Sequence, residues 1–192
     1  MSSVRTRYPA PYMKTYKFLS IADHELITKK LYEYVINHTD ILEKKWDWNT
    51  LDRNAVLEAI PELAVACSQI IDHPITMISI VHRSPGASGG VHVDVGNYDY
   101  RVLWPVANCQ GSYTRFFDLN GNKLVEAIGA EGDTFLTIEK KNPLIEIDAV
   151  ELTAPVVFST RTPHGVFTNP KCTESRLTAT LGFGKFPLEQ LF

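Results

Sequence analysis

The sequence predicts a mainly β fold, a jelly roll or closed barrel, with helices packed against one face. The first third of the chain carries apolar residues at helical spacing, whereas from residue 75 onward short β-rich runs alternate with turn residues. The 192 residues, 44% of them hydrophobic and 21% charged, are enough to bury one core without disulfides. We therefore expect a single domain over residues 1–192, with a helical part over 1–74 packed on a β core over 75–186.

Helical spacing is clearest near the N-terminus. Ser20 followed by Asp23 is typical of a helix start, and Ile27, Leu31 and Val35 then recur on one face. Pro61 separates two shorter helical stretches, because proline does not continue a helix. The expected helices cover residues 20–37, 50–60 and 62–71, after an extended arm over about the first ten residues.

Runs of β-branched and aromatic residues follow, separated by clusters of glycine, proline, asparagine and aspartate. The expected strands cover residues 75–82, 91–95, 100–109, 113–119, 134–138, 144–150, 156–160, 165–167 and 176–183. Asn120 and Gly121, between two apolar runs, are typical of the turn of a β-hairpin. Strands at this spacing favour a jelly roll or closed barrel.

Charge and cysteine content narrow the classes of function. Nineteen Lys and Arg against 22 Asp and Glu give a net charge of -3, which offers no general attraction to nucleic acid. Cys67, Cys109 and Cys172 are too few and too scattered for a disulfide framework. Neither a membrane-spanning run nor the apolar run of a secretory signal is found. We expect a cytoplasmic protein that binds neither nucleic acid nor a membrane.

The first pattern with chemical content is His92-Val93-Asp94. In a strand, residues two apart point to the same face, so His92 and Asp94 present an imidazole and a carboxylate to one ion. Such a triplet also arises by chance in roughly half of chains of this size and composition, so alone it is weak. The histidines at positions 24, 38, 73 and 82 fit surface or turn positions better.

The second pattern lies in the last strands. His164 opens one expected strand and Arg176 opens the next, so both can point into the mouth of a small barrel. Thr178, two residues after Arg176, adds a hydroxyl on the same face, and a guanidinium with a neighbouring hydroxyl suits a carboxylate. Arg101 opens a third expected strand and is a candidate for a second anion contact near the metal, or for an exposed strand edge.

Taken together, His92-x-Asp94, His164 and Arg176-x-Thr178 resemble the HxD…H…RxS/T pattern of iron(II)/2-oxoglutarate-dependent oxygenases. His164 follows Asp94 by 70 residues, and Arg176 follows His164 by 12. Within that superfamily the closest resemblance is to the aspartyl/asparaginyl β-hydroxylase-like branch. The resemblance to this branch lies in Arg101, nine residues after His92, and in Pro105, four residues after Arg101.

The resemblance implies a double-stranded β-helix core with His92, Asp94 and His164 as iron(II) ligands on one face of the metal. It also implies that 2-oxoglutarate is the cosubstrate and that Arg176, with Thr178 and Arg101, contacts it. The implied activity is that of a dioxygenase that hydroxylates an amino-acid, peptide or small-molecule substrate. Val91, Val93, Leu103, Trp104, Phe116 and Phe158 are candidates for an apolar lining, although most aromatic residues in a β-barrel belong to the core.

Two other classes of function stay open on the sequence alone. A metal-binding, cupin-like enzyme that does not use 2-oxoglutarate would keep His92, Asp94 and His164 but leave Arg176 without a cosubstrate. A non-enzymatic jelly-roll interaction module would place His92 and His164 far apart. The sequence also leaves open a homodimer, the identity of the substrate and the role of the glycine-rich segment 84–90 as a loop or a flap over the site.

Overall fold

The computed structural model describes residues 15–38, 48–87, 89–95, 99–128 and 134–184. The helices among them are α1 (His24–Asn37), α3 (Arg53–Ala59) and α4 (Pro61–Ser68). The strands are β1 (Tyr16–Phe18), β2 (Trp48–Thr50), β3 (Met77–Arg83), β4 (His92–Asp94), β5 (Tyr100–Ala107), β6 (Tyr113–Asp118), β7 (Lys123–Ile128), β8 (Thr134–Glu139), β9 (Ile145–Glu151), β10 (Val156–Ser159), β11 (His164–Phe167) and β12 (Arg176–Gly182). The expected N-terminal arm lies outside the described residues.

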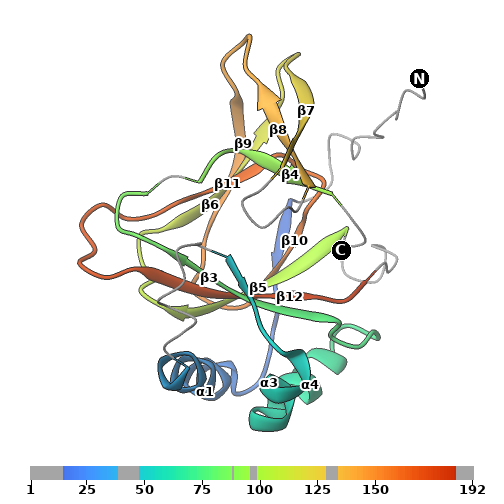
Figure 1. Ribbon diagram of the computed structural model, residues 1–192, viewed down its shortest axis with the longest axis vertical. Helices are drawn as coiled ribbons and strands as arrows, with labels where there is room; N and C mark the ends of the chain where they lie inside the picture. The colour runs from blue at the N-terminus through green and yellow to red at the C-terminus, as the bar shows by residue number, and fades with distance from the viewer. Residues whose placement is uncertain (1–14, 39–47, 88, 96–98, 129–133, 185–192) are drawn as a thin grey trace.

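The strands form two six-stranded antiparallel sheets, which confirms the predicted mainly β fold. The helix-side sheet has the order β1-β10-β5-β12-β3-β2, and the second sheet has the order β7-β8-β4-β11-β6-β9. Figure 1 shows the helices gathered beneath β3, β5 and β12, with β7, β8 and β9 extending at the opposite end. The space between the sheets holds the side chains discussed below.

The helices cover the outer face of the helix-side sheet. Ile27, Leu31 and Val35 form the buried stripe of α1 and share one hydrophobic core with Trp104 and Leu181 of the sheet. A pair of hydrogen bonds joins helix and strand, because Trp104 Nε1 donates to Thr28 Oγ1 over 2.8 Å and that hydroxyl donates to the Pro105 carbonyl. Among the described residues, no helix is long and apolar enough to cross a membrane.

The helical prediction for the first third is right in type for three segments and wrong in two places. Helix α1 begins at His24 and not at Ser20. The short strands β1 and β2 also lie in this part of the chain, and they form the two edges of the helix-side sheet. A three-residue strand is too short to show an alternating pattern, so its pairing partner alone decides its conformation. Asp52, by contrast, caps α3 by accepting hydrogen bonds from the backbone of Asn54 and Ala55.

The Asn120–Gly121 turn is present, but the hairpin it predicted is wrong. The turn connects β6 to β7, yet β6 pairs with β9 and β7 pairs with β8. Both turn residues have positive φ, 48° and 77°, as the dipeptide favours. The Asn122 side chain accepts hydrogen bonds from the backbone of Lys141 and Asn142, so this turn packs on the neighbouring turn between β8 and β9. Strand β7, absent from the predicted strands, begins at the next residue.

Candidate functional site

His92 and His164 come together because their strands pair. The two residues are direct partners in the antiparallel ladder of β4 and β11, so their side chains leave the same face of the second sheet. Their ring centroids lie 4.6 Å apart. His164 is buried against Phe158, at a centroid distance of 5.0 Å, whereas the side chain of His92 is 29% exposed. The His164 imidazole is therefore buried inside the molecule, whereas the His92 imidazole is partly accessible to solvent.

Asp94 completes the cluster from the same strand as His92. Because successive strand residues alternate between faces, Asp94 follows His92 onto the inner face while Val93 is buried on the other. Asp94 Oδ1 lies 3.4 Å from His92 Nε2. One ligand atom from each of His92, Asp94 and His164 lies within 4.8 Å of the other two. This spacing suits a single cation held by two nitrogens and one oxygen.

Backbone carbonyls orient both imidazoles. His92 Nδ1 donates to the Gly90 carbonyl over 2.8 Å, and His164 Nδ1 donates to the Thr162 carbonyl over 2.9 Å. A carbonyl oxygen only accepts, so Nδ1 carries a hydrogen in each ring, and in a neutral ring the lone pair is then on Nε2. Metal-bound histidines in proteins ordinarily have such a hydrogen bond on the second ring nitrogen.

Neighbouring groups favour an ionised Asp94 and burial favours a neutral His164, and these are the forms that bind a metal. Burial alone would raise the pKa of Asp94, but the hydrogen bond with His92 and the neighbouring positive charges hold it well below its usual range. Burial, with the charge of His92, lowers the pKa of His164 to about 4. Burial also lowers the pKa of His92, but the contact with Asp94 outweighs it and the net shift is upward. A metal at this site would replace the His92 proton.

Arg101 contacts the other oxygen of the same carboxylate. Its Nη1 lies 3.1 Å from Asp94 Oδ2, and its guanidinium carbon lies 4.9 Å from the centre of the Trp48 ring. The sequence predicted a basic side chain near the metal site at this position. The partner that the structure shows for it is Asp94, so Arg101 orients a candidate ligand.

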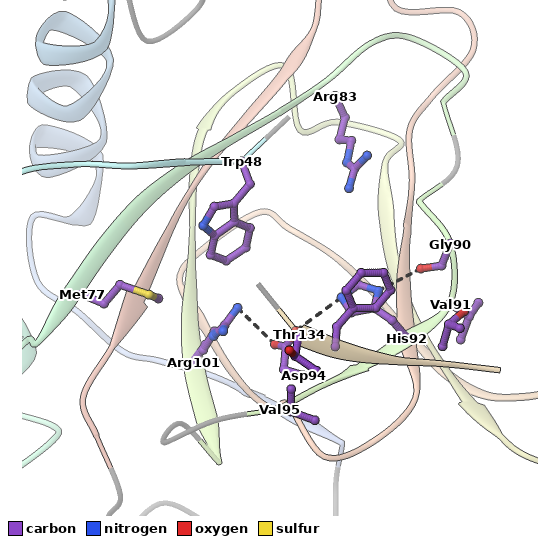
Figure 2. Close-up of a pocket in the computed structure, with 12 residues that line it drawn as sticks. Trp48, Met77, Arg83, Gly90, Val91, His92, Asp94, Val95, Arg101 and Thr134 are labelled. Atoms are coloured by element: carbon purple, nitrogen blue, oxygen red, sulfur yellow. Dashed lines mark hydrogen bonds and ion pairs between the residues drawn. The ribbon is translucent and has the colours of Figure 1, made fainter. Parts of the chain in front are cut away.

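A pocket of about 370 Å³ opens over this cluster. Figure 2 shows Arg83, Trp48 and Arg101 extending into it from the helix-side sheet, toward His92 and Asp94 of the second sheet. The remaining lining residues are Met77, Gly90, Val91, Val95, Thr134, Phe135 and Thr137. Gly90 is the last residue of the glycine-rich segment 84–90, whose end therefore forms part of the pocket wall.

The candidate apolar lining is only partly at the pocket, and two of its members, Phe116 and Phe158, lie beside His164. Of its six residues, Val91 alone lines the pocket among the described residues. Trp104 points into the core beneath the helices, because Arg101, Leu103 and Pro105 occupy the inner face of β5 and the residues between them face outward. Leu103, Phe116 and Phe158 pack together between the sheets, in a cluster separate from the helix-side core.

Arg176 and Thr178 lie on the inner face of β12. Arg176 is only 2% exposed and Thr178 only 1%, while Leu177 and Ala179 face the helices. Within the described part of the chain, Nε and Nη2 of Arg176 have no hydrogen-bond partner. Burial lowers the pKa of Arg176, and the Cys109 thiol lies beside its guanidinium. A buried guanidinium with donors to spare suits an anion, because leaving such a charge uncompensated costs several kcal/mol.

Arg83 and Trp48 are among the pocket residues that the sequence patterns overlooked. Arg83 is the direct ladder partner of Arg176 across β3 and β12. Met77, Ser79 and Val81 precede it on the same face of β3, so a two-residue period starting at Met77 would have placed it on the inner face. Trp48 lies in the three-residue strand β2, where no pattern was available.

Comparisons with known proteins identify the fold. No family model matches the chain, and no curated protein matches it in sequence. Among solved structures, a Pseudomonas putida prolyl-4-hydroxylase is similar with a TM-score of 0.52 and 16% identity, over 90% of this chain and 94% of that one. EvdO2 from Micromonospora carbonacea var. aurantiaca, complexed with 2-oxoglutarate, has a TM-score of 0.53 and 13% identity over 90% and 87% of the two chains.

A third similar structure is the epimerase SnoN in complex with Fe3+, alpha-ketoglutarate and nogalamycin RO. Its TM-score is 0.50 and its identity 12%, over 89% of this chain and 79% of that one. At such identities the similarity concerns the fold. It confirms the jelly-roll class that the sequence predicts.

Proposed function

We propose that this protein is an iron(II)- and 2-oxoglutarate-dependent oxygenase that hydroxylates an amino-acid, peptide or other small-molecule substrate. The observation that carries the proposal is the buried guanidinium of Arg176, on the inner face of the sheet opposite the His92, Asp94 and His164 cluster. A metal site alone fits many enzymes. A metal site together with a buried cation in need of a carboxylate fits a chelating 2-oxo diacid in particular.

The residues present fit the implied metal. Two imidazoles and one carboxylate suit iron(II) and leave coordination positions for other ligands. When bound, iron(II) with 2-oxoglutarate supplies the activation of dioxygen, with succinate and carbon dioxide formed from the cosubstrate. The jelly-roll fold shared with EvdO2 and SnoN, whose structures contain 2-oxoglutarate, supports the same reading.

Each residue of the site then has a defined task. His92, Asp94 and His164 hold the metal, and the carbonyls of Gly90 and Thr162 keep the Nε2 lone pairs directed at it. Arg101 fixes the rotation of the Asp94 carboxylate. Arg176, with the hydroxyl of Thr178 on the same face, binds the distal carboxylate of the cosubstrate.

The finer placement in the aspartyl/asparaginyl β-hydroxylase-like branch belongs to this proposal. Its support is Arg101 and Pro105 in the positions of that pattern, both on the inner face of β5. The shared core between the helices and the helix-side sheet supports our proposal that residues 1–192 form one domain. Succinate release over a panel of free amino acids and short peptides tests the substrate class.

Calorimetry tests the use of 2-oxoglutarate. The full chain loaded with manganese(II) is titrated with 2-oxoglutarate, in parallel with Arg176→Ala and with Arg115→Gln, an arginine on the outer face of β6. We expect binding to the wild type and to Arg115→Gln, and none to Arg176→Ala. Metal binding without any response to 2-oxoglutarate would favour a cupin-like enzyme that uses another mechanism. Absence of metal binding would favour a non-enzymatic module.

A further inference from the structure

Arg83 and Arg176 form an adjacent pair of guanidiniums on the inner face of the helix-side sheet. They are direct partners in the antiparallel ladder of β3 and β12. Side chains in this relationship leave the same face with Cβ atoms about 5 Å apart, and like charges so placed destabilise a sheet. Burial lowers the pKa of Arg176, and the charge of Arg83 lowers it further. An anion between or beside the two groups would offset this repulsion.

The two arginines differ in their access to the pocket. Arg176 is almost fully buried, whereas Arg83 is half-buried and lines the pocket that contains His92 and Asp94. Figure 2 shows its guanidinium directed toward the space above His92. Arg83 thus lines the pocket, beside the more deeply buried Arg176.

The surroundings of Arg83 keep space for this side chain. Gly89 is buried beside it, and a Cβ at Gly89 would lie 3.5 Å from Arg83 Nη2 and equally close to the Val166 backbone nitrogen. The Gly89 amide is held in place by the Val166 carbonyl, at 2.7 Å. The glycine therefore brings the loop close to β11 without filling the volume next to the guanidinium.

We propose that Arg83 is a second carboxylate-binding residue, which shares with Arg176 the distal carboxylate of the 2-oxo diacid. This inference rests on the proposed function. A carboxylate has four lone-pair positions, so it can accept hydrogen bonds from two guanidiniums, and its negative charge offsets the repulsion between them. Arg176 holds this carboxylate from inside the sheet, and Arg83 covers it from the pocket side.

Titration of manganese(II)-loaded full-length protein with two ligands tests the proposal. One ligand is 2-oxoglutarate, and the other is oxalate, which chelates a metal through adjacent oxygens but has no distal carboxylate. For Arg83→Gln we expect 2-oxoglutarate to bind about tenfold more weakly or worse, equal to 1.4 kcal/mol, with oxalate affinity unchanged. Arg83→Lys keeps the positive charge but lacks the paired donors of a guanidinium, so we expect a smaller loss of 2-oxoglutarate affinity than in Arg83→Gln.

Arg115→Gln is the matched control, because it removes one positive charge from an arginine on the outer face of β6, where Glu146 and the Phe167 ring are its partners. Both ligands should bind this variant as they bind the wild type. Unfolding with and without ligand provides a second readout. We expect Arg83→Gln to gain less stability from 2-oxoglutarate than the wild type gains.

The possible results separate the two proposals. Unchanged 2-oxoglutarate affinity in Arg83→Gln, with binding lost in Arg176→Ala, overturns the role of Arg83 and leaves the proposed function intact. Equal weakening of oxalate and 2-oxoglutarate also overturns it, because the effect is then a general one of charge. Failure of the wild type to bind 2-oxoglutarate removes the proposed function itself.

Discussion

Arg101 and Asp94 form an ion pair that the pocket largely shields from solvent. Nη1 of Arg101 lies 3.1 Å from Oδ2 of Asp94, and each side chain is 12% exposed. The opposite carboxylate oxygen faces His92 Nε2. Asp94 therefore contacts both Arg101 and His92, so its removal should affect stability and metal binding separately.

We expect Asp94→Ala to abolish metal binding and to lower the free energy of unfolding of the metal-free protein by about 1–3 kcal/mol, because the Arg101 charge loses its partner. Adding Arg101→Gln should restore part of that stability without restoring metal binding. Denaturant unfolding and metal analysis of the four proteins in this cycle provide the measurement. Additive stability effects would show that the pair is not coupled.

The two histidines should lose the metal equally but differ in their effect on stability. His164→Ala leaves a cavity beside Phe116 and Phe158, so we expect a loss of about 1–3 kcal/mol. His92→Ala affects a partly exposed ring and should cost less than about 1 kcal/mol. Metal content and denaturant midpoints of both variants check this. Retention of metal by either one contradicts its assignment as a ligand.

Two glycines near His92 offer a matched pair. A Cβ at Gly165 would lie 3.2 Å from the Gly89 carbonyl oxygen and 3.4 Å from Val91 Cγ2, so Gly165→Ala should press on the segment leading to His92. We expect a loss of about 1–3 kcal/mol in stability together with weaker metal binding. At Gly90 no atom lies within 4 Å of a Cβ, so Gly90→Ala should leave both quantities nearly unchanged. The reverse order of effects would contradict the described loop position.

Trp104 should prove structural. Its Nε1 donates to Thr28 Oγ1 in the core beneath the helices, so Thr28→Val leaves a buried donor without its partner. We expect this substitution to cost about 1–3 kcal/mol in the free energy of unfolding. Manganese(II) and 2-oxoglutarate affinities, measured on the folded variant, should match the wild type. A change in either affinity would place Trp104 in the site after all.

Much of this fold could be predicted from local patterns. Strands and inner faces could be predicted from the alternation around His92 and Asp94 and from the runs that begin at or beside Arg101, His164 and Arg176. Local patterns do not specify which strands pair, since pairing depends on residues far away in the chain. For that reason the predicted hairpin at Asn120 was wrong, and β1, β2 and β7 were not predicted.

The same distinction applies to the candidate site. A two-residue period suffices to place His92 and Asp94 together. The nearness of Arg83 to Arg176 depends on the register between β3 and β12, which no local pattern specifies. Leu103 and Trp104 are neighbours in a strand, so only one of them can face the pocket side, and Trp104 packs against the helices instead.

The proposed oxygenase activity is best tested by measuring succinate formed from 2-oxoglutarate by the iron(II)-loaded protein, in air, with the amino-acid and peptide panel. We expect succinate from the wild type and from Arg115→Gln, and none from Asp94→Ala, from Arg176→Ala, or from anaerobic and iron-free controls. Equal succinate from the wild type and Asp94→Ala, or none from the wild type with any member of the panel, would contradict the proposed activity.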